Sequence, residues 1–263
     1  MFESIRKFFR EQEVAIKKLE WPRDDVEEST KFFKVLFDSY SPSIGNLNAS
    51  YQSFVNELSL MASLSHPNII QFLGFVEDTT KGDAWIILPW ESNGNVREFL
   101  KSGEWDIPER ISLIQDAAKG LLYLHTHDPP ICHGDLKSLN ILVNSSYQAI
   151  ITDFGSARIR RNVASDNGSE TPCQYSLRWT APEVLDDGTQ DLPSDMWALG
   201  WIVTGRLPFD ELNKETAVII HTMKGKLPAI RNDTRLSHVL MLCGLMSDCW
   251  LFQPPKRINA SMF

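Results

Sequence analysis

The spacing of apolar residues changes once along this chain, close to Gly94, and this change constrains the fold more than any other feature. Before it, short apolar runs such as 13–19 (EVAIKKL) and 84–90 (AWIILPW) have the length and composition typical of strands. After it, apolar residues recur every three or four positions, as they do on one face of a helix. The sequence therefore predicts an α+β protein in which a strand-rich lobe precedes a helical lobe.

One helix interrupts the strand-rich half. Residues at helical spacing form a stripe that ends before His66-Pro67, and its positions are Phe54, Glu57, Leu58, Met61 and Leu64. The runs 69–76 (IIQFLGFV) and 84–90 then predict two strands separated by a turn-rich segment. Glu57 is the exception on this stripe, because a carboxylate that faces a core is unfavourable unless it meets a cation. It either pairs with Lys17, in the run VAIKKL, or reaches water from the edge of the stripe.

The second half predicts mainly helices. Pro108 begins a long helix, whose apolar face carries Ile111, Ile114, Ala118, Leu121, Leu122 and His125. Further helical segments follow from Ser194 to Trp250. His125, His127 and Asp128 do not share one helix face, so a metal site built from protein ligands alone is not favoured.

Composition narrows the classes of protein. The chain has 263 residues, 43% of them hydrophobic, and a net charge of -8, which disfavours a nucleic-acid partner because phosphate binding needs a basic face. No apolar run reaches the ~20 residues that a membrane helix needs, and the N-terminus lacks the apolar core of a signal peptide. We therefore expect no membrane partner and a cytoplasmic location, with the nucleus as the alternative. The sequence carries no signal for an oligomeric state.

Several polar motifs follow apolar runs. In HGDLKSLNILV (133–143), Asp135, Lys137 and Asn140 come just before an apolar strand, and in ITDFGSAR the residue Asp153 follows another. Each motif is weak alone, since an acid before a glycine can simply form a turn. The motifs TAPEVL and SDMWALG, further along the chain, are equally weak alone.

Together, these motifs resemble the signature set of the eukaryotic protein kinase domain. VAIK with Lys17, the helix with Glu57, HGDLKSLN, DFG and APE occur in the family's order. Asp135 to Asn140 is five residues and Asn140 to Asp153 is thirteen, which agrees with the family. The resemblance extends from about residue 13 to the end of the chain.

The resemblance implies a bilobal fold. One protein kinase domain would span residues 1–263, with a small antiparallel β lobe that holds one helix in 1–90 and a larger helical lobe in 91–263. The phrases SLRWTAPE and HPNIIQFLGF are similar to the tyrosine-kinase-like branch. Lys137 in DLKSLN is similar to serine/threonine kinases, so the implied activity is ATP-dependent phosphoryl transfer to serine and threonine hydroxyls of a protein substrate.

The resemblance also implies how ATP and Mg²⁺ are held. Lys17 would bind the α- and β-phosphates and would be steadied by Glu57. Asp153 and Asn140 would bind Mg²⁺, which prefers oxygen ligands. Asp135 would orient the substrate hydroxyl and accept its proton.

Three further groups of residues have roles implied by the resemblance. The adenine ring would lie between Ala15 and Leu142, with Leu88 as gatekeeper and the backbone of Pro89 and Glu91 as hydrogen-bonding partners. Lys137 would lie beside the γ-phosphate, and Ser176 would take the place of the family's threonine that contacts the catalytic loop. The remaining expectations are an internal hydrophobic spine of Met61, Phe72, His133 and Phe154 based on Asp195, and an ion pair between Glu183 and Arg257.

The sequence also departs from the family pattern. The glycine-rich loop belongs roughly twenty residues before the strand lysine, but sixteen residues precede Lys17 and the first glycine is Gly45, so the loop is absent from this sequence. Residues 35–50 are typical of an inserted loop, and the helix that follows Asp195 is about one turn short. A pseudokinase that acts as a binding module is therefore the alternative to an active kinase.

Gly134 is another departure. Most family members have an arginine here, which pairs with a phosphorylated residue of the activation segment. Gly134 lacks such a side chain, so we expect activity that does not depend on activation-segment phosphorylation. A glycine that is needed for a positive φ is the other explanation, although relatives accommodate arginine at this position.

Overall fold

The computed structural model describes residues 5–9, 12–20, 57–78, 83–160, 176–204, 207–227 and 240–262. The predicted insertion at 35–50 lies outside these residues. The chain divides into two compact units, here called the N-lobe (Met1–His66 with Ile70–Glu91) and the C-lobe (Pro67–Ile69 with Ser92–Phe263).

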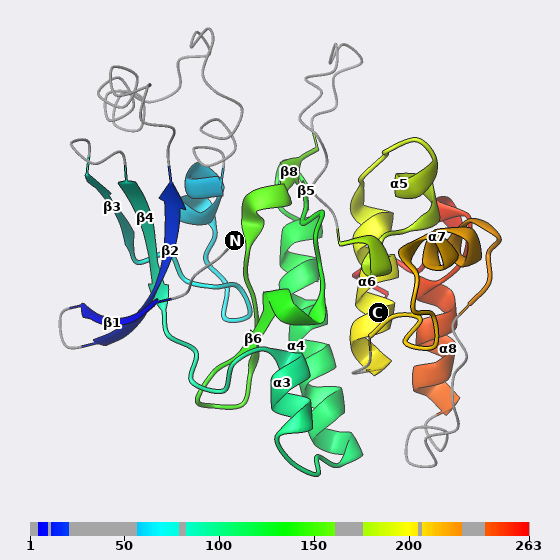
Figure 1. Ribbon diagram of the computed structural model, residues 1–263, viewed down its shortest axis with the longest axis horizontal. Coiled ribbons are helices and arrows are strands. Elements are labelled where there is room, and N and C mark those ends of the chain that lie inside the picture. The colour runs from blue at the N-terminus through cyan, green and yellow to red at the C-terminus, as the bar shows by residue number, and fades with distance from the viewer. Residues whose placement is uncertain are drawn as a thin grey trace, which may run out of the picture. The chain divides into compact units, whose positions relative to one another are not determined.

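The N-lobe contains an antiparallel sheet of four strands in the order β1-β2-β4-β3, with helical residues 57–63 (Figure 1). The strand bounds are β1 Ile5–Phe9, β2 Gln12–Glu20, β3 Gly74–Asp78 and β4 Asp83–Pro89. The predicted strand at 13–19 and the predicted helix after Glu57 are confirmed, while Phe54 lies outside the described residues. Strand β4 lies between β2 and β3, and its residue Ile86 is fully buried. A strand in this central position is covered by neighbours, which agrees with the hydrophobic run that forms it.

The register of the sheet positions two predicted site residues. Ala15 pairs with Leu88 and Lys17 pairs with Ile86, across β2 and β4. Side chains two residues apart on a strand point to the same face, so Ala15 and Lys17 share one face of the sheet. Trp90, just after β4, donates its backbone N–H to Glu13 at 3.2 Å and closes that end of the strand pair.

The predicted strand at 69–76 is wrong at its beginning, because β3 begins at Gly74. The beginning of the run pairs within the C-lobe instead, where Ile69 forms a parallel β-bridge with Ile151. The preceding residue is held in the same place, since Asn68 Nδ2 donates to the Ala149 carbonyl at 2.9 Å and the Ile151 N–H donates to the Asn68 carbonyl at 2.9 Å. This approach is close enough that a Cβ on Gly120 would lie 2.7 Å from the Asn68 carbonyl oxygen. The apolar run 69–76 therefore contributes its first residue to the C-lobe and its last three residues to β3 of the N-lobe. The prediction of a strand is right only for that last part.

Helices make up most of the C-lobe, as predicted. Their bounds are α3 Val96–Lys101, α4 Ile107–His125, α5 Pro182–Asp186, α6 Leu192–Thr204, α7 Glu215–Met223 and α8 Leu240–Cys249. The long helix begun by Pro108 is confirmed as α4. Across the described ranges, none of the helices has the length and apolarity that crossing a bilayer requires.

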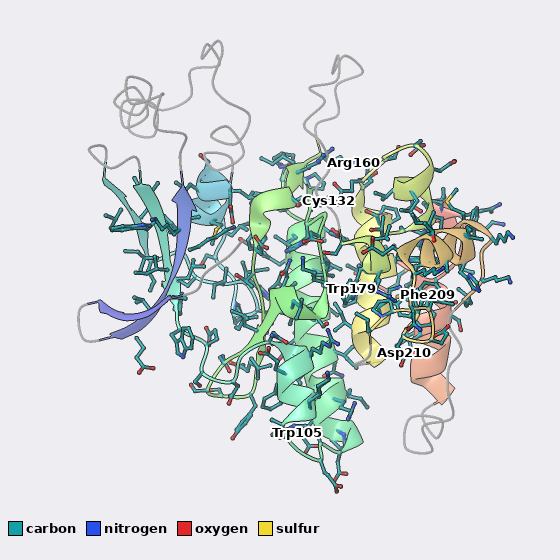
Figure 2. All side chains as sticks on the ribbon, viewed as in Figure 1. Trp105, Cys132, Arg160, Trp179, Phe209 and Asp210 are labelled. Carbon is teal, nitrogen blue, oxygen red and sulfur yellow. The ribbon has the colours of Figure 1, made fainter. Side chains whose placement is uncertain are left out.

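Short strands and 3₁₀ turns connect these helices. They are β5 Ile131–Cys132, η1 Ser138–Asn140, β6 Ile141–Val143, β7 Ala149–Ile151, η2 Phe154–Ser156, β8 Arg158–Ile159, η3 Leu177–Trp179 and η4 Pro254–Lys256. Two antiparallel pairs, β6 with β7 and β5 with β8, hold the loops between them. Figure 2 labels Cys132 and Arg160 at the β5–β8 pair, where the Arg160 N–H donates to the Pro130 carbonyl at 2.7 Å.

Helix α6 is the centre of the C-lobe. It lies between α4 and α8 (Figure 1) and is apolar nearly all round, with Trp197 and Leu199 almost completely buried. Gly200 lets α8 approach closely, since a Cβ there would lie 2.9 Å from the Cβ of Cys249, at the end of α8, and 2.6 Å from Nε1 of the following Trp250. A helix buried on all sides is held rigidly by its neighbours, which makes α6 a fixed base for the polar residues described below.

The predicted pair of Glu183 and Arg257 is confirmed. Arg257 Nη1 lies 2.5 Å from Glu183 Oε1 and Nη2 lies 2.7 Å from Oε2, a bidentate arrangement. The Arg257 Nε group also donates to the Leu251 carbonyl at 2.7 Å, and the guanidinium lies 5.1 Å from the centre of the Trp197 ring. The pair therefore ties α5 to the C-terminal part of the lobe and to α6.

Replacing Glu183 by glutamine is expected to destabilise the C-lobe by about 3 kcal/mol, because the buried guanidinium of Arg257 loses its counter-charge. Urea unfolding followed by tryptophan fluorescence measures the change. The matched control is Glu211→Gln, since Glu211 is exposed. Equal stabilities for the two variants would show that the ion pair contributes little.

Candidate active site

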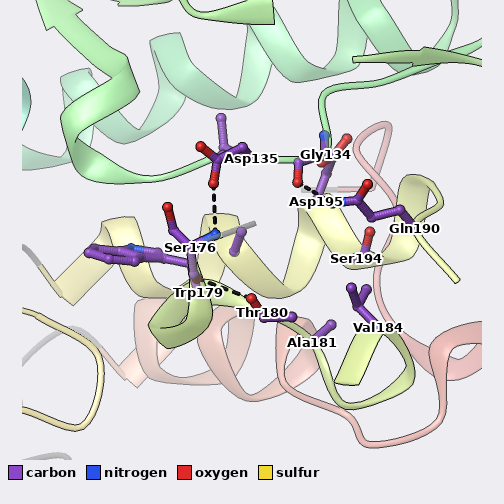
Figure 3. A pocket seen from close by; sticks show the side chains of 12 residues that line it. Gly134, Asp135, Ser176, Trp179, Thr180, Ala181, Val184, Gln190, Ser194 and Asp195 are labelled. Carbon is purple, nitrogen blue, oxygen red and sulfur yellow. Dashed lines mark hydrogen bonds between the residues drawn. The ribbon is translucent and has the colours of Figure 1, made fainter. Parts of the chain in front are cut away.

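The segment 133–140 is held by α6 through one carboxylate. Asp195 Oδ2 accepts the His133 N–H at 2.8 Å, and Oδ1 accepts the Gly134 N–H at 2.9 Å (Figure 3). His125, the last residue of α4, donates Nε2–H to Asp195 Oδ2 at 3.0 Å. His125 thus completes the hydrogen bonding of a buried carboxylate, which gives this histidine a structural partner.

Asp195 is 2% exposed, so its ionisation state depends on these donors. Burial by itself raises the pKa of Asp195, but the hydrogen bond from His125 and the Gly134 N–H outweigh it and hold the pKa below its ordinary value. The carboxylate is therefore charged, and it orients two successive peptide groups.

The ring of His133 orients the next peptide. Its Nε2 lies 3.0 Å from the Thr152 carbonyl, which can only accept, so Nε2 carries the proton and Nδ1 accepts the Asp135 N–H at 3.3 Å. The ring also packs on Phe154, with 5.3 Å between ring centroids. This contact confirms the C-lobe half of the predicted spine. The places of Met61 and Phe72, both in the N-lobe, stay predictions.

The carboxylate of Asp135 is surrounded by donors. Oδ2 accepts from Lys137 Nζ at 2.6 Å and from Asn140 Nδ2 at 3.3 Å, while Oδ1 accepts the Ser176 N–H at 3.0 Å. Lys137 Nζ also donates to Ser176 Oγ at 2.8 Å, so the predicted contacts of Ser176 are confirmed. The structure thus brings a carboxylate, an ammonium group and a hydroxyl together, with Asp135 and Lys137 both partly accessible.

Asn140 and Asp153 carry oxygens of the kind that Mg²⁺ prefers, and their role as its ligands stays a prediction. Both N–H groups of the Asn140 amide face Asp135, at 2.9 Å from its carbonyl and 3.3 Å from its carboxylate, which leaves the amide oxygen as the ligand atom. The Thr152 N–H donates to the Asn140 carbonyl at 2.9 Å, which brings the residue before Asp153 against Asn140. Mg²⁺ takes one or two protein oxygens and completes its shell with phosphates and water, so two such residues suffice.

The backbone of Asp153 is unusual. Its φ of 66° and ψ of 74° are left-handed, a conformation that favours glycine and that aspartate adopts at some expense. Such conformations concentrate at functional sites, where the surroundings enforce them. Here η2 begins directly after Asp153, and the Phe154 ring in it is buried.

Gly134 corrects one part of the sequence analysis. Its φ is +78°, and a Cβ at this position would lie 2.6 Å from the Ser156 carbonyl oxygen. A side chain is therefore excluded by both backbone conformation and space, although we expected the position to accommodate arginine. The close approach brings the beginning of the activation segment directly against the catalytic loop.

In the N-lobe, Lys17 Nζ forms an ion pair with Glu57 Oε1. The side chains are 17% and 6% exposed, so Glu57 does not reach water from the edge of its helix. This settles the choice between the two readings of Glu57 in favour of the lysine partner. The nearly buried carboxylate of Glu57 thus holds the ammonium group of Lys17, a residue of β2, in place.

The residues predicted to bind adenine are placed on different elements. Leu88 is buried in β4 opposite Ala15, and Pro89 ends that strand. Leu142 lies in β6 of the C-lobe, opposite Ile150. Burial raises the pKa of Glu91 above its ordinary value. Their roles toward a nucleotide stay predictions.

One residue that contacts the site was not found from the sequence. Gln190 donates its Nε2–H to the Gly134 carbonyl at 2.5 Å. A glutamine in a polar surface segment carries no signal in a single sequence.

Comparisons with known proteins identify the family of this chain. The sequence profile of the family described as protein tyrosine and serine/threonine kinase matches residues 43–262. Serine/threonine-protein kinase CTR1 of Arabidopsis thaliana is 34% identical over 214 residues, covering 78% of this chain and 25% of the relative. Ephrin type-B receptor 5 of Gallus gallus is 30% identical over 271 residues, covering 94% and 26%. Serine/threonine-protein kinase STY17 of Arabidopsis thaliana is 29% identical over 214 residues, covering 79% and 35%.

The chain belongs to the protein tyrosine and serine/threonine kinase family. Its α+β architecture, with a small antiparallel sheet in one lobe and helices in the other, is the bilobal fold of that family, and the resemblance to the tyrosine-kinase-like branch is confirmed. The chain spans about a quarter of the length of CTR1 and of ephrin type-B receptor 5.

Asp195→Asn is expected to lower the free energy of unfolding by about 3 kcal/mol near neutral pH, because three donors lose a charged acceptor. The folded-state pKa of Asp195 is lowered, so this contribution is complete above the unfolded value of about 3.9 and is lost as pH falls through the folded value. Urea unfolding of both proteins from about pH 6 to about pH 3 should show the difference shrinking below about pH 4. A difference that is constant with pH would contradict a lowered pKa.

Proposed function

We propose that this chain transfers the γ-phosphoryl group of ATP to serine and threonine hydroxyls of proteins, with Mg²⁺. One observation carries the proposal: the carboxylate of Asp135 is partly accessible and is aligned by Lys137 Nζ and by the Ser176 N–H. Family membership supports ATP-dependent chemistry.

The geometry suits a proton transfer. ATP supplies the phosphoryl group, and the new bond forms between its γ-phosphorus and the substrate oxygen as the bond to the β-phosphate oxygen breaks. Asp135 orients the attacking hydroxyl and takes its proton on the carboxylate. Lys137 balances the negative charge beside that carboxylate and, in the proposed complex, that of the transferred group.

Lys137 and Ser176 favour serine and threonine as acceptors. The ammonium group bridges Asp135 Oδ2 at 2.6 Å and Ser176 Oγ at 2.8 Å, which places it between the base and the activation segment. Lys137 in the motif DLKSLN is also similar to serine/threonine kinases. Two of the relatives, CTR1 and STY17, are named as serine/threonine-protein kinases, which supports the same class.

Some of the residues that would hold the nucleotide and its metal ion already have partners in the protein, as Lys17 has in Glu57 and Asn140 has in Asp135. We infer that Lys17, fixed by Glu57, binds the α- and β-phosphates, and that Asn140 and Asp153 bind Mg²⁺. Ala15, Leu88, Pro89, Glu91 and Leu142 are the proposed adenine contacts. The net charge of -8 favours a protein over a nucleic acid as the acceptor.

An active kinase is better supported than a pseudokinase. The charged catalytic positions of the signature set are present, and the hydrogen bonds of Asp135, Lys137 and Asn140 are all formed. A binding module would have no need to keep a carboxylate aligned by an ammonium group and a backbone N–H.

Asp135→Asn is expected to lower kcat for a serine peptide by at least about 100-fold, because the amide cannot accept the proton. MgATP binding should be retained, since the proposed phosphate and metal ligands are unchanged. Kinase assays and the shift of melting temperature with MgATP measure the two effects. Asp210→Asn is the control, because Asp210 is an exposed aspartate of the same lobe. An unchanged kcat in Asp135→Asn would remove the proposed base.

Activity is expected not to depend on phosphorylation of the activation segment. The sites in question, Ser165, Ser169 and Thr171, lie outside the described residues, but Gly134 has no side chain to pair with a phosphate. Phosphatase treatment, or alanine at the three positions, should change kcat by less than about tenfold, equivalent to about 1.4 kcal/mol in the barrier. A larger fall in kcat would show that another cationic side chain binds the phosphate.

A further inference from the structure

Gln190 makes a polar contact to the carbonyl of the peptide that carries the proposed base. Its Nε2 donates to the Gly134 carbonyl at 2.5 Å, and Figure 3 shows the side chain directed at the Gly134–Asp195 contact. Because a carbonyl oxygen can only accept, the nitrogen of the amide must face it, and the orientation of the amide is settled. Among the residues that the structure describes, no other donor reaches this carbonyl.

The peptide between Gly134 and Asp135 is thereby held at both ends. Its carbonyl accepts from Gln190, and its N–H, on Asp135, donates to His133 Nδ1 at 3.3 Å. Asp195 holds the preceding N–H, on Gly134, at 2.9 Å. Loss of the Gln190 bond would leave the peptide plane fixed on one side only.

Glycine makes this restraint necessary. Gly134 is at φ +78°, and without a Cβ its peptide groups rotate more freely than those of any other residue. The surroundings also exclude a side chain here, since a Cβ would lie 2.6 Å from the Ser156 carbonyl oxygen and 3.3 Å from Gln190 Oε1. Gln190 occupies the space beside the glycine and limits the motion that the glycine allows.

The chemistry of the residue matters more than its volume. Gln190 Oε1 is buried, and no donor from the described part of the chain reaches it. A buried acceptor without a donor costs roughly 1–3 kcal/mol, so packing alone does not favour an amide at this position. The property that distinguishes Gln190 from an apolar side chain of the same size is its N–H donor, which satisfies the Gly134 carbonyl.

We propose that Gln190 is a positioning residue: it fixes the Gly134–Asp135 peptide and so aligns the Asp135 carboxylate for phosphoryl transfer. This inference rests on the proposed function. Gln190 acts through the backbone and touches neither substrate nor nucleotide. A small cavity of about 20 Å³, enough for a single water molecule, lies beside it and is lined by Gly134, Asp135 and Asp195.

Two substitutions of similar size separate donor chemistry from packing. Gln190→Met removes the donor, and Gln190→Glu replaces it by an oxygen that faces the carbonyl oxygen. We expect kcat to fall about tenfold in Gln190→Met, equivalent to about 1.4 kcal/mol, and further in Gln190→Glu. KM for ATP should change by less than about twofold, because the interaction lost acts on alignment and not on nucleotide binding. Gln148→Met is the control, since Gln148 is exposed in the turn between β6 and β7.

Amide hydrogen exchange of residues 131–140 gives a readout that needs no activity. Exchange should be about tenfold faster in Gln190→Met than in wild type or Gln148→Met, because the local opening energy falls by about 1.4 kcal/mol. Unchanged exchange would overturn the inference, and so would faster exchange with wild-type kcat. A wild-type protein without kinase activity, but with faster exchange in Gln190→Met, would support the restraint on the loop and overturn the proposed function instead.

Discussion

The site depends on the burial of one carboxylate in the first turn of a buried helix. Asp195 lies in α6 and is 2% exposed, an environment that disfavours charge. The N–H groups of His133 and Gly134 and the ring of His125 offset that penalty together. Since α6 packs between α4 and α8, the catalytic loop takes its position from a buried helix.

From this carboxylate, hydrogen bonds lead step by step to the chemistry. Asp195 orients two peptide groups, the ring of His133 orients the third, and the third carries Asp135. The side chain of Asp135 then aligns with Lys137 and with the backbone of Ser176 in the activation segment. The loss of any one of these hydrogen bonds would therefore change the position of Asp135, the proposed base.

The ion pair of Lys17 with Glu57 was predictable from the sequence, because a buried charge restricts its possible partners. Glu57 on an apolar stripe needed a cation, and Lys17 was the candidate in the same lobe. Other features were not predictable in this way. The beginning of β3 depends on Asn68 bonding to β7, and the glycine at 134 depends on the approach of Ser156. Both are contacts between segments distant in sequence, and apolar spacing contains no information about them.

The sequence by itself determined the class of fold, the order of the two lobes and the residue types at each chemical position. These follow from local periodicity and from motif spacing, which the chain carries in one dimension. Only the tertiary structure decided that Gly134 must lack a side chain, that His125 serves Asp195 and that Gln190 holds the peptide before Asp135. The physical reason is that each of these depends on a distance of about 3 Å between segments dozens of residues apart, at the scale of a single hydrogen bond.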